Sequence, residues 1–473
     1  MKVKKLVVAT ALTSLAALSL ASCGGSGNKV EFDDSIIDSV DLSQPIEIEF
    51  WHTMGKPIQE ILTERITEFN KIYPNITIKH KQIGGYNDVK DQIVQNFGTQ
   101  AYPNLAYCYP DHVALYNEAQ ITVALDGLAN NAKYGFGGSE LTTKFAEVDA
   151  TPIKESDLVS SFYQEGKQFG DGKTYTLPFL KSTEVLYYNV DFFTEHSLTV
   201  PTTWDEMWDT CAKIKEIDPN SVPLGYDSAD NLFITLAQSY GYEYTSNNSF
   251  DFNNEGMRNL VKEFRGYYDK GYFTTKLLNG DQYTSNVFKD STASNRMYMC
   301  VGSSAGASNQ KASNKAFQVG VAGVPSANGK ELKAISQGPS LTILKSDDPA
   351  KVVASWIFAQ YLLTDFSQAA FALATGYLPV TTTSIKIDAY EESMNLKDGY
   401  DHLPETAASF ANSHSNMYFT SSVFIGSSIA REQCGSLFNQ VMADNSINSS
   451  NIDSKIQTYF DEAIQKCKYE SGL

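Results

Sequence analysis

The sequence predicts an α/β fold with more than one lobe. Residues 46–53, IEIEFWHT, alternate apolar and polar side chains as a strand does, and residues 76–83, ITIKHKQI, alternate again. Between them, Pro57 begins a segment whose apolar residues recur at helical spacing. A strand, a helix and a second strand in so short a segment imply parallel neighbouring strands joined by a right-handed crossover.

The same unit then repeats along the chain. Residues 86–99 have the pattern of a second helix, and the short apolar run at 105–108 predicts a third strand. Further helices are expected at 204–217, 257–273 and 354–363. The 428 residues from Ile46 onward exceed what one core organises, so two lobes are expected.

The N-terminal 22 residues have the pattern of a signal peptide, because three lysines precede an apolar stretch that ends in small residues. The ending Leu20-Ala21-Ser22-Cys23 resembles a bacterial lipobox, which implies cleavage before Cys23 and a lipid on its thiol. Residues 23–45 are polar and rich in Gly, Ser and Asp, which predicts a flexible tether. We therefore expect an extracytoplasmic protein anchored to the membrane through Cys23.

The net charge argues against a nucleic-acid partner, and the spacing of the cysteines argues against a disulfide framework. Without the three lysines of the signal peptide, the formal net charge goes from −18 to −21, which argues against a nucleic-acid partner. The remaining five cysteines are widely spaced, so we interpret them mainly as buried small residues, with one disulfide left open.

Motifs of catalysis and metal binding are weak in this chain. Residues 302–306, GSSAG, fit G-x-S-x-G, but the segment after them is a poor helix and the histidines that follow lie in polar loop sequence. Residues 251–256 imitate half of a calcium loop, yet Lys262 stands where a glutamate should close it. No zinc or nucleotide motif is present. We assign no catalytic residue, metal or cofactor, and we expect a protein that is not an enzyme.

Aromatic residues are abundant, with 27 Tyr and 26 Phe. Most rings at this density belong to cores. Tyrosines together with acids and amides also suit a polyhydroxylated ligand, because rings cover its C–H faces while carboxylates and amides bond its hydroxyls.

One segment identifies a family resemblance. Residues 177–193, LPFLKSTEVLYYNVDFF, followed by PTTWDEMWDTCAKI at 201–214, resemble the substrate-binding proteins of ABC sugar importers, in the branch of the glycerol-3-phosphate-binding and maltodextrin-type proteins. Further matching pieces follow in the same order, from IEIEFWHTM to the late segment AISQGPSLTILKSDDPAKVVASWIFAQYLLTDFSQAAFALATGYLPV.

The resemblance implies a two-lobed periplasmic-binding-protein fold of type II, each lobe a mainly parallel sheet flanked by helices. It places the three crossover segments at 181–184, 320–325 and 376–380. The charged step from Lys181 to Glu184 would then pass along the wall of a ligand cleft; an ion-paired strand start at the surface is the alternative. The implied domain bounds are 46–183 with 326–378 for the N-lobe and 184–325 with 379–473 for the C-lobe.

The resemblance also implies a set of ligand-binding residues in the cleft. They are Tyr86, Tyr109, Asp111, Ser182, Asp230, Ser303, Ser304, Gly338, Tyr377 and, by the best register, Phe424.

Two departures from the glycerol-phosphate binders bear on the ligand. Asp230 stands where those proteins carry a tryptophan, and Phe424 stands where they carry an arginine. A lost guanidinium and an added carboxylate disfavour phosphate, so we expect a neutral sugar or oligosaccharide. Glycerol 3-phosphate or a glycerophosphodiester is the alternative ligand, and a secreted serine hydrolase or a surface adhesin is the alternative class. The expected partners are the carbohydrate and an ABC permease, and the expected state is a monomer.

Overall fold

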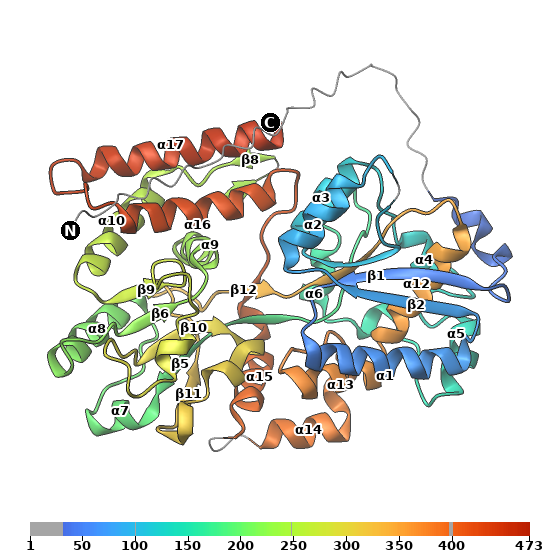
Figure 1. Ribbon diagram of the computed structural model, residues 1–473, viewed down its shortest axis with the longest axis horizontal. Coiled ribbons are helices and arrows are strands. Elements are labelled where there is room, and N and C mark those ends of the chain that lie inside the picture. The colour runs from blue at the N-terminus through green and yellow to red at the C-terminus, as the bar shows by residue number, and fades with distance from the viewer. Residues whose placement is uncertain (1–31, 100, 247, 397–400) are drawn as a thin grey trace, which may run out of the picture. The chain divides into compact units, whose positions relative to one another are not determined.

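The structure is a computed structural model that describes residues 32–99, 101–246, 248–396 and 401–473 (Figure 1). Residues 32–473 form one compact unit with two large sheets, each the centre of one lobe. The expected signal peptide, Cys23 and the start of the expected tether lie outside the described residues.

The end of the expected tether is folded, which corrects the prediction that residues 23–45 are flexible throughout. A 3-10 helix, η1 (Asp34–Ser39), begins with the Asp33 carboxylate accepting the backbone N–H of Ser35. Ile37 of this helix is buried in the core of the first lobe. The polar composition of the segment hid this, because only a few apolar side chains, Ile37 with Phe32, Val40 and Leu42, pack it against the core.

The first lobe surrounds a sheet with strand order β2-β1-β3-β13-β4. Its strands are β1 (Ile46–His52), β2 (Ile76–Gln82), β3 (Leu105–Cys108), β4 (Leu177–Pro178) and β13 (Ser340–Ile343). Its helices are α1 (Lys56–Ile72), α2 (Tyr86–Gln95), α3 (Pro110–Glu118), α4 (Asp126–Asn130), α5 (Ser139–Ala146), α6 (Ser160–Glu165), α12 (Pro349–Leu362), α13 (Asp365–Thr375) and α14 (Asp388–Asn395). The predicted strand–helix–strand unit is confirmed, with β1 parallel to β2 and to β3.

The second lobe surrounds a sheet with strand order β14-β12-β5-β10-β6-β9, and β11 also pairs with β5. Its strands are β5 (Ser182–Asn189), β6 (Leu224–Tyr226), β9 (Phe273–Thr275), β10 (Met299–Ser303), β11 (Val319–Ala322), β12 (Ala334–Gln337) and β14 (Tyr418–Phe419), with a hairpin of β7 (Thr245–Ser246) and β8 (Ser249–Phe250) beside them. Its helices are α7 (Val190–Glu195), α8 (Trp204–Ile217), α9 (Ala229–Tyr240), α10 (Glu255–Asp269), α11 (Ser285–Phe288), α16 (Ser427–Ala443) and α17 (Ile452–Ser471).

Both sheets are mixed rather than mainly parallel. The strand–helix–strand units are parallel, as in β10 with β6 and β6 with β9. Strands next to the passages between lobes run the other way: β13 is antiparallel to β3, and β5 is antiparallel to β10. A chain that arrives from the other lobe approaches the sheet from the cleft side, so its direction is opposite to that of the local units.

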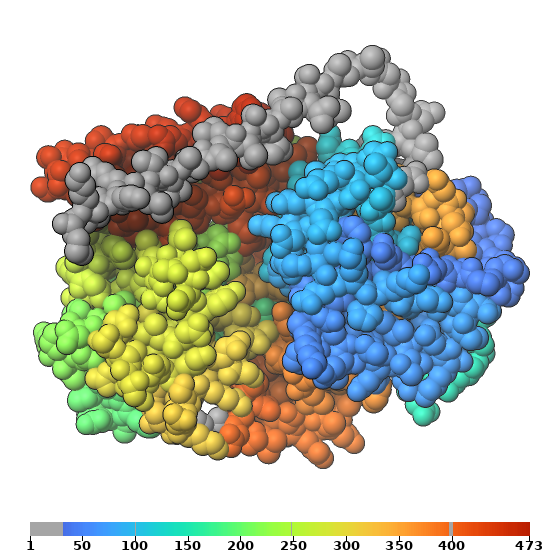
Figure 2. Space-filling view, in the orientation of Figure 1, coloured from blue at the N-terminus to red at the C-terminus, as the bar shows by residue number. Residues whose placement is uncertain are grey.

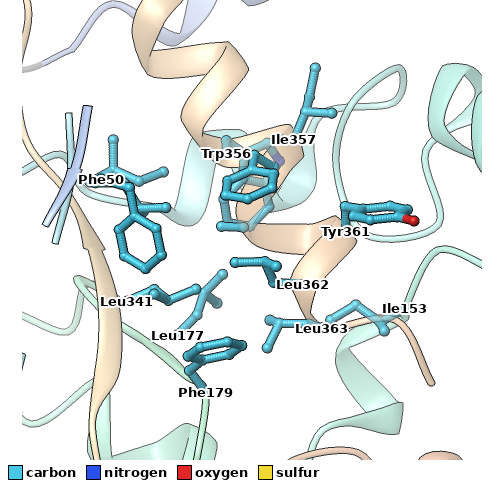
Figure 3. Close-up of a cluster of buried hydrophobic side chains, with 14 of the residues drawn as sticks. Phe50, Ile153, Leu177, Phe179, Leu341, Trp356, Ile357, Tyr361, Leu362 and Leu363 are labelled. Carbon is cyan, nitrogen blue, oxygen red and sulfur yellow. The ribbon is translucent and has the colours of Figure 1, made fainter. Parts of the chain in front are cut away.

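The core of the first lobe lies between its sheet and α12 (Figure 3). Phe50 of β1, Leu341 of β13 and Leu177 of β4 meet Trp356 and Leu362 of α12 there. The indole N–H of Trp356 donates to the carbonyl of Tyr134 at 2.7 Å, which satisfies the one polar group of that ring. The apolar run predicted as a helix at 354–363 is thus buried within α12.

Two findings concern the cysteines and the possibility of a membrane-spanning helix. The five described cysteines are all buried and unpaired, as expected of small core residues. Among the helices formed by the described residues, none has the length and apolar content needed to cross a bilayer.

The chain passes from the second sheet back to the first at Gly338. β12 pairs with β5 in the second lobe, whereas β13, three residues later, pairs with β3 in the first. Gly338 has φ +94°, and a Cβ on it would lie 2.0 Å from the carbonyl oxygen of Leu180. Only glycine fits here, because the two passages cross in backbone contact.

This position corrects the second expected crossover, at 320–325. Those residues include β11, which lies within the second sheet beside β5. Gly320 is needed there for a packing reason, since its missing Cβ leaves room for the ring of Tyr188. Residues 326–337 accordingly belong to the second lobe and not to the N-lobe.

The third passage also differs from its expected place at 376–380. Leu378 donates its N–H to the carbonyl of Lys181 at 2.7 Å, so this segment lies beside the first passage. The chain then remains on the first lobe through α14, which packs on α13. Helix α15 (Leu403–Ser413) bridges the lobes, with Ala408 and Ala411 in the first core and Leu403 in the second. The change of lobe is completed between α15 and α16 (Figure 1).

Two charged residues flank the first passage, and both are buried. Lys181 forms an ion pair with Glu165 and donates to the carbonyl of Gly338 at 3.2 Å. Glu184 accepts hydrogen bonds from the Tyr226 hydroxyl at 2.5 Å and the Asn231 amide at 3.2 Å. The alternative of an ion-paired strand start at the surface is therefore wrong, because the ion pair of Lys181 with Glu165 is buried inside the protein.

Burial changes the ionisation of Glu184. Removal from water raises the pKa of this carboxyl to about 8, although the hydrogen bonds from Tyr226 and Asn231 lower it in part. Glu184 is therefore protonated in the folded protein at neutral pH, and it can be kept inside the strand without a cationic partner.

Gly338→Ala should destabilise the protein by about 2 to 4 kcal/mol, because the new Cβ adds a backbone clash to an unfavourable φ. Gly329→Ala is the matched control. Its φ is +68°, but nothing lies within 4 Å of the added atom, so it should cost only about 1 to 2 kcal/mol. Chemical denaturation measures both, and equal costs would contradict the close crossing at Gly338.

Glu184→Gln should flatten the pH dependence of stability. The folded pKa of about 8 lies above the ordinary value of 4.5, so the folded state holds its proton more tightly than the unfolded state. The wild-type protein keeps this contribution below pH 4.5 and loses it as the pH rises through about 8. Glutamine does not titrate, so the variant should gain stability relative to wild type across this range.

Urea unfolding at pH 5, 7 and 8.5 measures the difference. The exposed Glu195 at the end of α7 provides the control, and Glu195→Gln should follow the wild-type profile. A Glu184→Gln profile parallel to wild type would show that Glu184 is ionised in the folded protein.

Candidate ligand-binding site

A cavity of about 410 Å³ lies between the two lobes. In the space-filling view, a furrow separates the blue surface of the first lobe from the yellow surface of the second (Figure 2). Residues from both lobes line the cavity, and most of them have polar or aromatic side chains. The lining residues are Tyr86, Tyr109, Pro110, Asp111, Glu165, Ser182, Ser228, Asp230, Asn231, Tyr283, Ser303, Ser336, Gln337, Gly338, Tyr377, Ser421, Ser422, Val423 and Arg431.

Eight of the residues expected at the cleft line this cavity. They are Tyr86, Tyr109, Asp111, Ser182, Asp230, Ser303, Gly338 and Tyr377. Most follow the carboxyl end of a strand or begin a helix. Tyr109 and Asp111 follow β3, Ser303 ends β10, and Asp230 follows β6. Ligand crevices form at such strand ends in open α/β sheets.

Ser304 and Phe424 do not line the cavity. Ser304 is fully buried, and its hydroxyl accepts the backbone N–H of Thr183 at 3.2 Å. Phe424 packs against Phe250 in the core of the second lobe, with ring centroids 5.6 Å apart. Its neighbour Val423 faces the cavity instead.

The buried hydroxyl of Ser304 also bears on the hydrolase alternative. Ser304 is the central serine of the G-x-S-x-G match, and a nucleophile at that position has to be exposed on a strand–helix turn. Here β10 leads into a 3-10 helix, η3 (Ser304–Gln310), and no histidine is among the described residues that line the cavity. The geometry does not fit an acyl-transfer site.

Tyrosines form one wall of the cavity. The rings of Tyr86 and Tyr109 lie 4.3 Å apart between centroids, and Tyr107 stacks behind Tyr86 at 5.8 Å. Burial raises the pKa values of Tyr86 and Tyr377, so both hydroxyls stay protonated and can donate hydrogen bonds. This wall offers ring faces together with phenolic donors.

Arg431 of α16 is the important cavity residue that sequence reasoning missed. Its Nε donates to Asp111 Oδ2 at 3.3 Å, and its Nη1 donates to Asn231 Oδ1 at 2.8 Å and lies 3.9 Å from Asp230 Oδ2. The interpretation that no guanidinium reaches the cleft is therefore wrong. The register chosen for the segment around Phe424 stopped short of the helix that carries Arg431.

The pair of Arg431 and Asp111 joins the lobes across the cavity, because α3 belongs to the first lobe and α16 to the second. Burial alone would raise the pKa of Asp111, but its interactions with His112 and Arg431 outweigh this effect and lower the pKa. Asp111 is therefore ionised at neutral pH and holds the guanidinium as a charged partner.

No cluster of metal ligands accompanies the cavity. Nowhere in the described part of the chain do three His, Cys, Asp or Glu side chains gather so that they could hold a metal ion.

Comparison with known proteins gives the family. The profile of the family described as bacterial extracellular solute-binding protein matches residues 64–398. Among curated relatives, the sn-glycerol-3-phosphate-binding periplasmic protein UgpB of Pectobacterium atrosepticum is 26% identical over 372 residues, which cover 75% of this chain and 78% of the relative. UgpB of Escherichia coli is 24% identical over 380 residues, with the same coverage.

Solved structures share the fold at low identity. UgpB from Mycobacterium tuberculosis, in complex with glycerophosphocholine, has a TM-score of 0.71 and 16% identity, covering 90% of this chain and 99% of that one. The ABC substrate-binding protein Lmo0181 from Listeria monocytogenes, in complex with cycloalternan, has a TM-score of 0.68 and 16% identity, covering 91% and 100%.

These structures confirm the two-lobed solute-binding fold. Because the family profile covers most of the chain, the protein belongs to the family of bacterial extracellular solute-binding proteins.

Proposed function

We propose that the protein, as a monomer, captures a neutral sugar or oligosaccharide between its lobes and delivers it to an ABC permease. The observation that carries the proposal is the state of Arg431. It is the sole cation among the described residues that line the main cavity, and two carboxylates already hold it, Asp111 and Asp230. A phosphate would have to displace these carboxylates and face them.

The rest of the lining suits hydroxyl groups. Serine hydroxyls are contributed by Ser182 and Ser228, amides by Asn231 and Gln337, and ring faces by the tyrosine wall. Glu165 also faces the cavity, but Lys181 neutralises its charge from behind. Such a lining can bond many hydroxyls in both directions without placing an unmatched charge on the ligand.

Closure of the lobes supplies the mechanism of capture. Ligand contacts from both lobes exist together only when the lobes are closed, so a bound sugar shifts the population towards the closed form. The passages beside Lys181, at Gly338 and between α15 and α16 connect the lobes and are where backbone angles would change. The permease would then recognise the closed form.

A glycerophosphodiester is the second candidate ligand. Arg431 is a guanidinium in the cleft, and a fork of this kind can bond phosphate oxygens if its carboxylate partners move away. The relatives add support, since the Pectobacterium protein is a glycerol-3-phosphate-binding protein and the Mycobacterium structure contains glycerophosphocholine.

Asp230→Ala separates the two candidates. For a neutral sugar, the change leaves hydroxyls without a charged acceptor, which should cost about 1.5 to 3 kcal/mol, or roughly ten- to hundredfold in affinity. For a phosphate ligand, it removes a repelling carboxylate and frees Arg431, so binding should tighten. Calorimetric titration of wild type and variant against sugars, glycerol 3-phosphate and glycerophosphocholine measures the sign.

Asp205→Ala in α8 is the control, because this aspartate does not line the cavity, and it should bind every ligand like wild type. Tighter binding by Asp230→Ala would establish the phosphate candidate. Unchanged affinity for the best ligand would remove Asp230 from the site.

Membrane attachment is a second part of the proposal and rests on the sequence alone, since Cys23 lies outside the described residues. We propose that the signal peptide is cleaved before Cys23 and that lipid on this thiol holds the protein at the outer face of the membrane. A permease could then collect the closed form nearby.

Cys23→Ala should leave unprocessed precursor or release protein from the membrane fraction, because the acylated thiol is lost. Immunoblots of fractionated cells measure both outcomes. Cys467→Ala, at a buried cysteine of α17, should be processed like wild type. Normal cleavage and retention of the Cys23 variant would contradict the lipid anchor.

A further inference from the structure

A second chamber, of about 690 Å³, continues from the main cavity. Tyr86, Tyr109, Asp230, Tyr283 and Arg431 line both spaces, so they form the boundary between them. The second chamber is also built by both lobes. The start of α2 and His112 of α3 contribute from the first lobe, and α16 and the loop after β9 from the second.

The loop after β9 holds two large apolar side chains at the boundary of this chamber. Leu277 and Tyr283 are each 56% exposed, and both line the chamber. Exposed apolar side chains that lie together beside a cavity are typical of ligand-binding grooves. The ammonium of Lys276 lies 4.8 Å from the centroid of the Tyr283 ring, and the remaining exposure leaves ring surface open to the chamber.

Hydrogen bonds fix this loop at both ends. At its end, the backbone N–H and hydroxyl of Thr284 donate to Asp227 Oδ1 at 2.6 and 2.8 Å. At its start, the hydroxyl of Thr275 donates to Asn439 Oδ1 at 2.7 Å. The backbone of Tyr283 is therefore next to Thr284, which is fixed by its bonds to Asp227, while the exposed Tyr283 ring is not packed in a core.

A polar group without a partner lies on the opposite lobe. His112 is 3% exposed, lines the chamber, and its Nδ1 has no hydrogen-bond partner. Burial lowers its pKa to about 4, so the ring is neutral at neutral pH. The chamber thus combines an open aromatic face with uncharged, acidic and basic hydrogen-bonding groups, and its two cations, Lys276 and Arg431, both have acidic partners.

We propose that the second chamber is a ligand subsite, with Tyr283 as the residue that selects for ligand length, and that the solute is an oligosaccharide extending from the main cavity past this ring. The inference rests on the proposed function and adds to it the size of the ligand. A solute that fills both chambers contacts both lobes twice, and each added contact favours the closed form.

The test is a calorimetric titration with two ladders of sugars, glucose to maltotetraose and glucose to cellotetraose. For the wild-type protein, affinity in the recognised ladder should rise by about tenfold or more between the monosaccharide and the trisaccharide. Tyr283→Ala should lose about tenfold in affinity for the long sugars only. Tyr283→Phe keeps the ring and should bind like wild type.

Tyr469→Ala is the matched control, because this tyrosine is 82% exposed on α17 and lines neither chamber. Melting temperatures of all variants, without sugar, verify that they are folded.

The outcomes separate the inference from the proposed function. Affinity that does not increase with length, or a Tyr283→Ala loss that is equal at every length, overturns the second subsite and leaves sugar binding standing. Failure of every sugar in both ladders to bind overturns the neutral-sugar function itself, and the subsite with it.

Discussion

Burial of charge at the junction of the lobes is the constraint on which the rest of this structure depends. The strand that enters the second lobe begins beside Lys181 and carries Glu184, and neither side chain reaches solvent. Unpaired buried charges are costly. The protein resolves this in two ways: Lys181 pairs with Glu165, while Glu184 keeps its proton and accepts bonds from Tyr226 and Asn231. Neither side chain is thereby left as an unmatched charge inside the junction.

The same arrangement extends into the cleft. Asn231 donates to Glu184 with its amide nitrogen and accepts from Arg431 with its oxygen, so the buried Glu184 orients the guanidinium through this amide. Arg431 then reaches Asp111 on the opposite lobe. A continuous set of hydrogen bonds therefore runs from the core of the second lobe, across the cavity, to the first. A captured solute has to fit beside these hydrogen bonds. A neutral polyhydroxylated solute can do so while Arg431 stays paired with Asp111.

Backbone contacts, and not a glycine- and proline-rich composition, determine where the chain passes between the lobes. Residues 320–325 combine glycines with proline, yet 320–322 belong to β11 in the second sheet. Gly338 is also next to a proline, Pro339, and its role follows from the carbonyl of Leu180, which leaves no room for a Cβ. A glycine needed for close packing and one needed for a crossing cannot be told apart from the sequence, because the neighbour that requires it comes from a distant segment.

The sequence by itself determined the strand–helix–strand units, with β1, α1, β2 and β3 close to their predicted bounds, because hydrophobic periodicity is a local property. The resemblance carried by its motifs placed Asp111 and Asp230 at the cleft, and both line the cavity. Only the tertiary structure decided that Arg431 faces Asp111. These residues are 320 positions apart, and their contact depends on how the two lobes place α3 against α16. No local pattern contains that information.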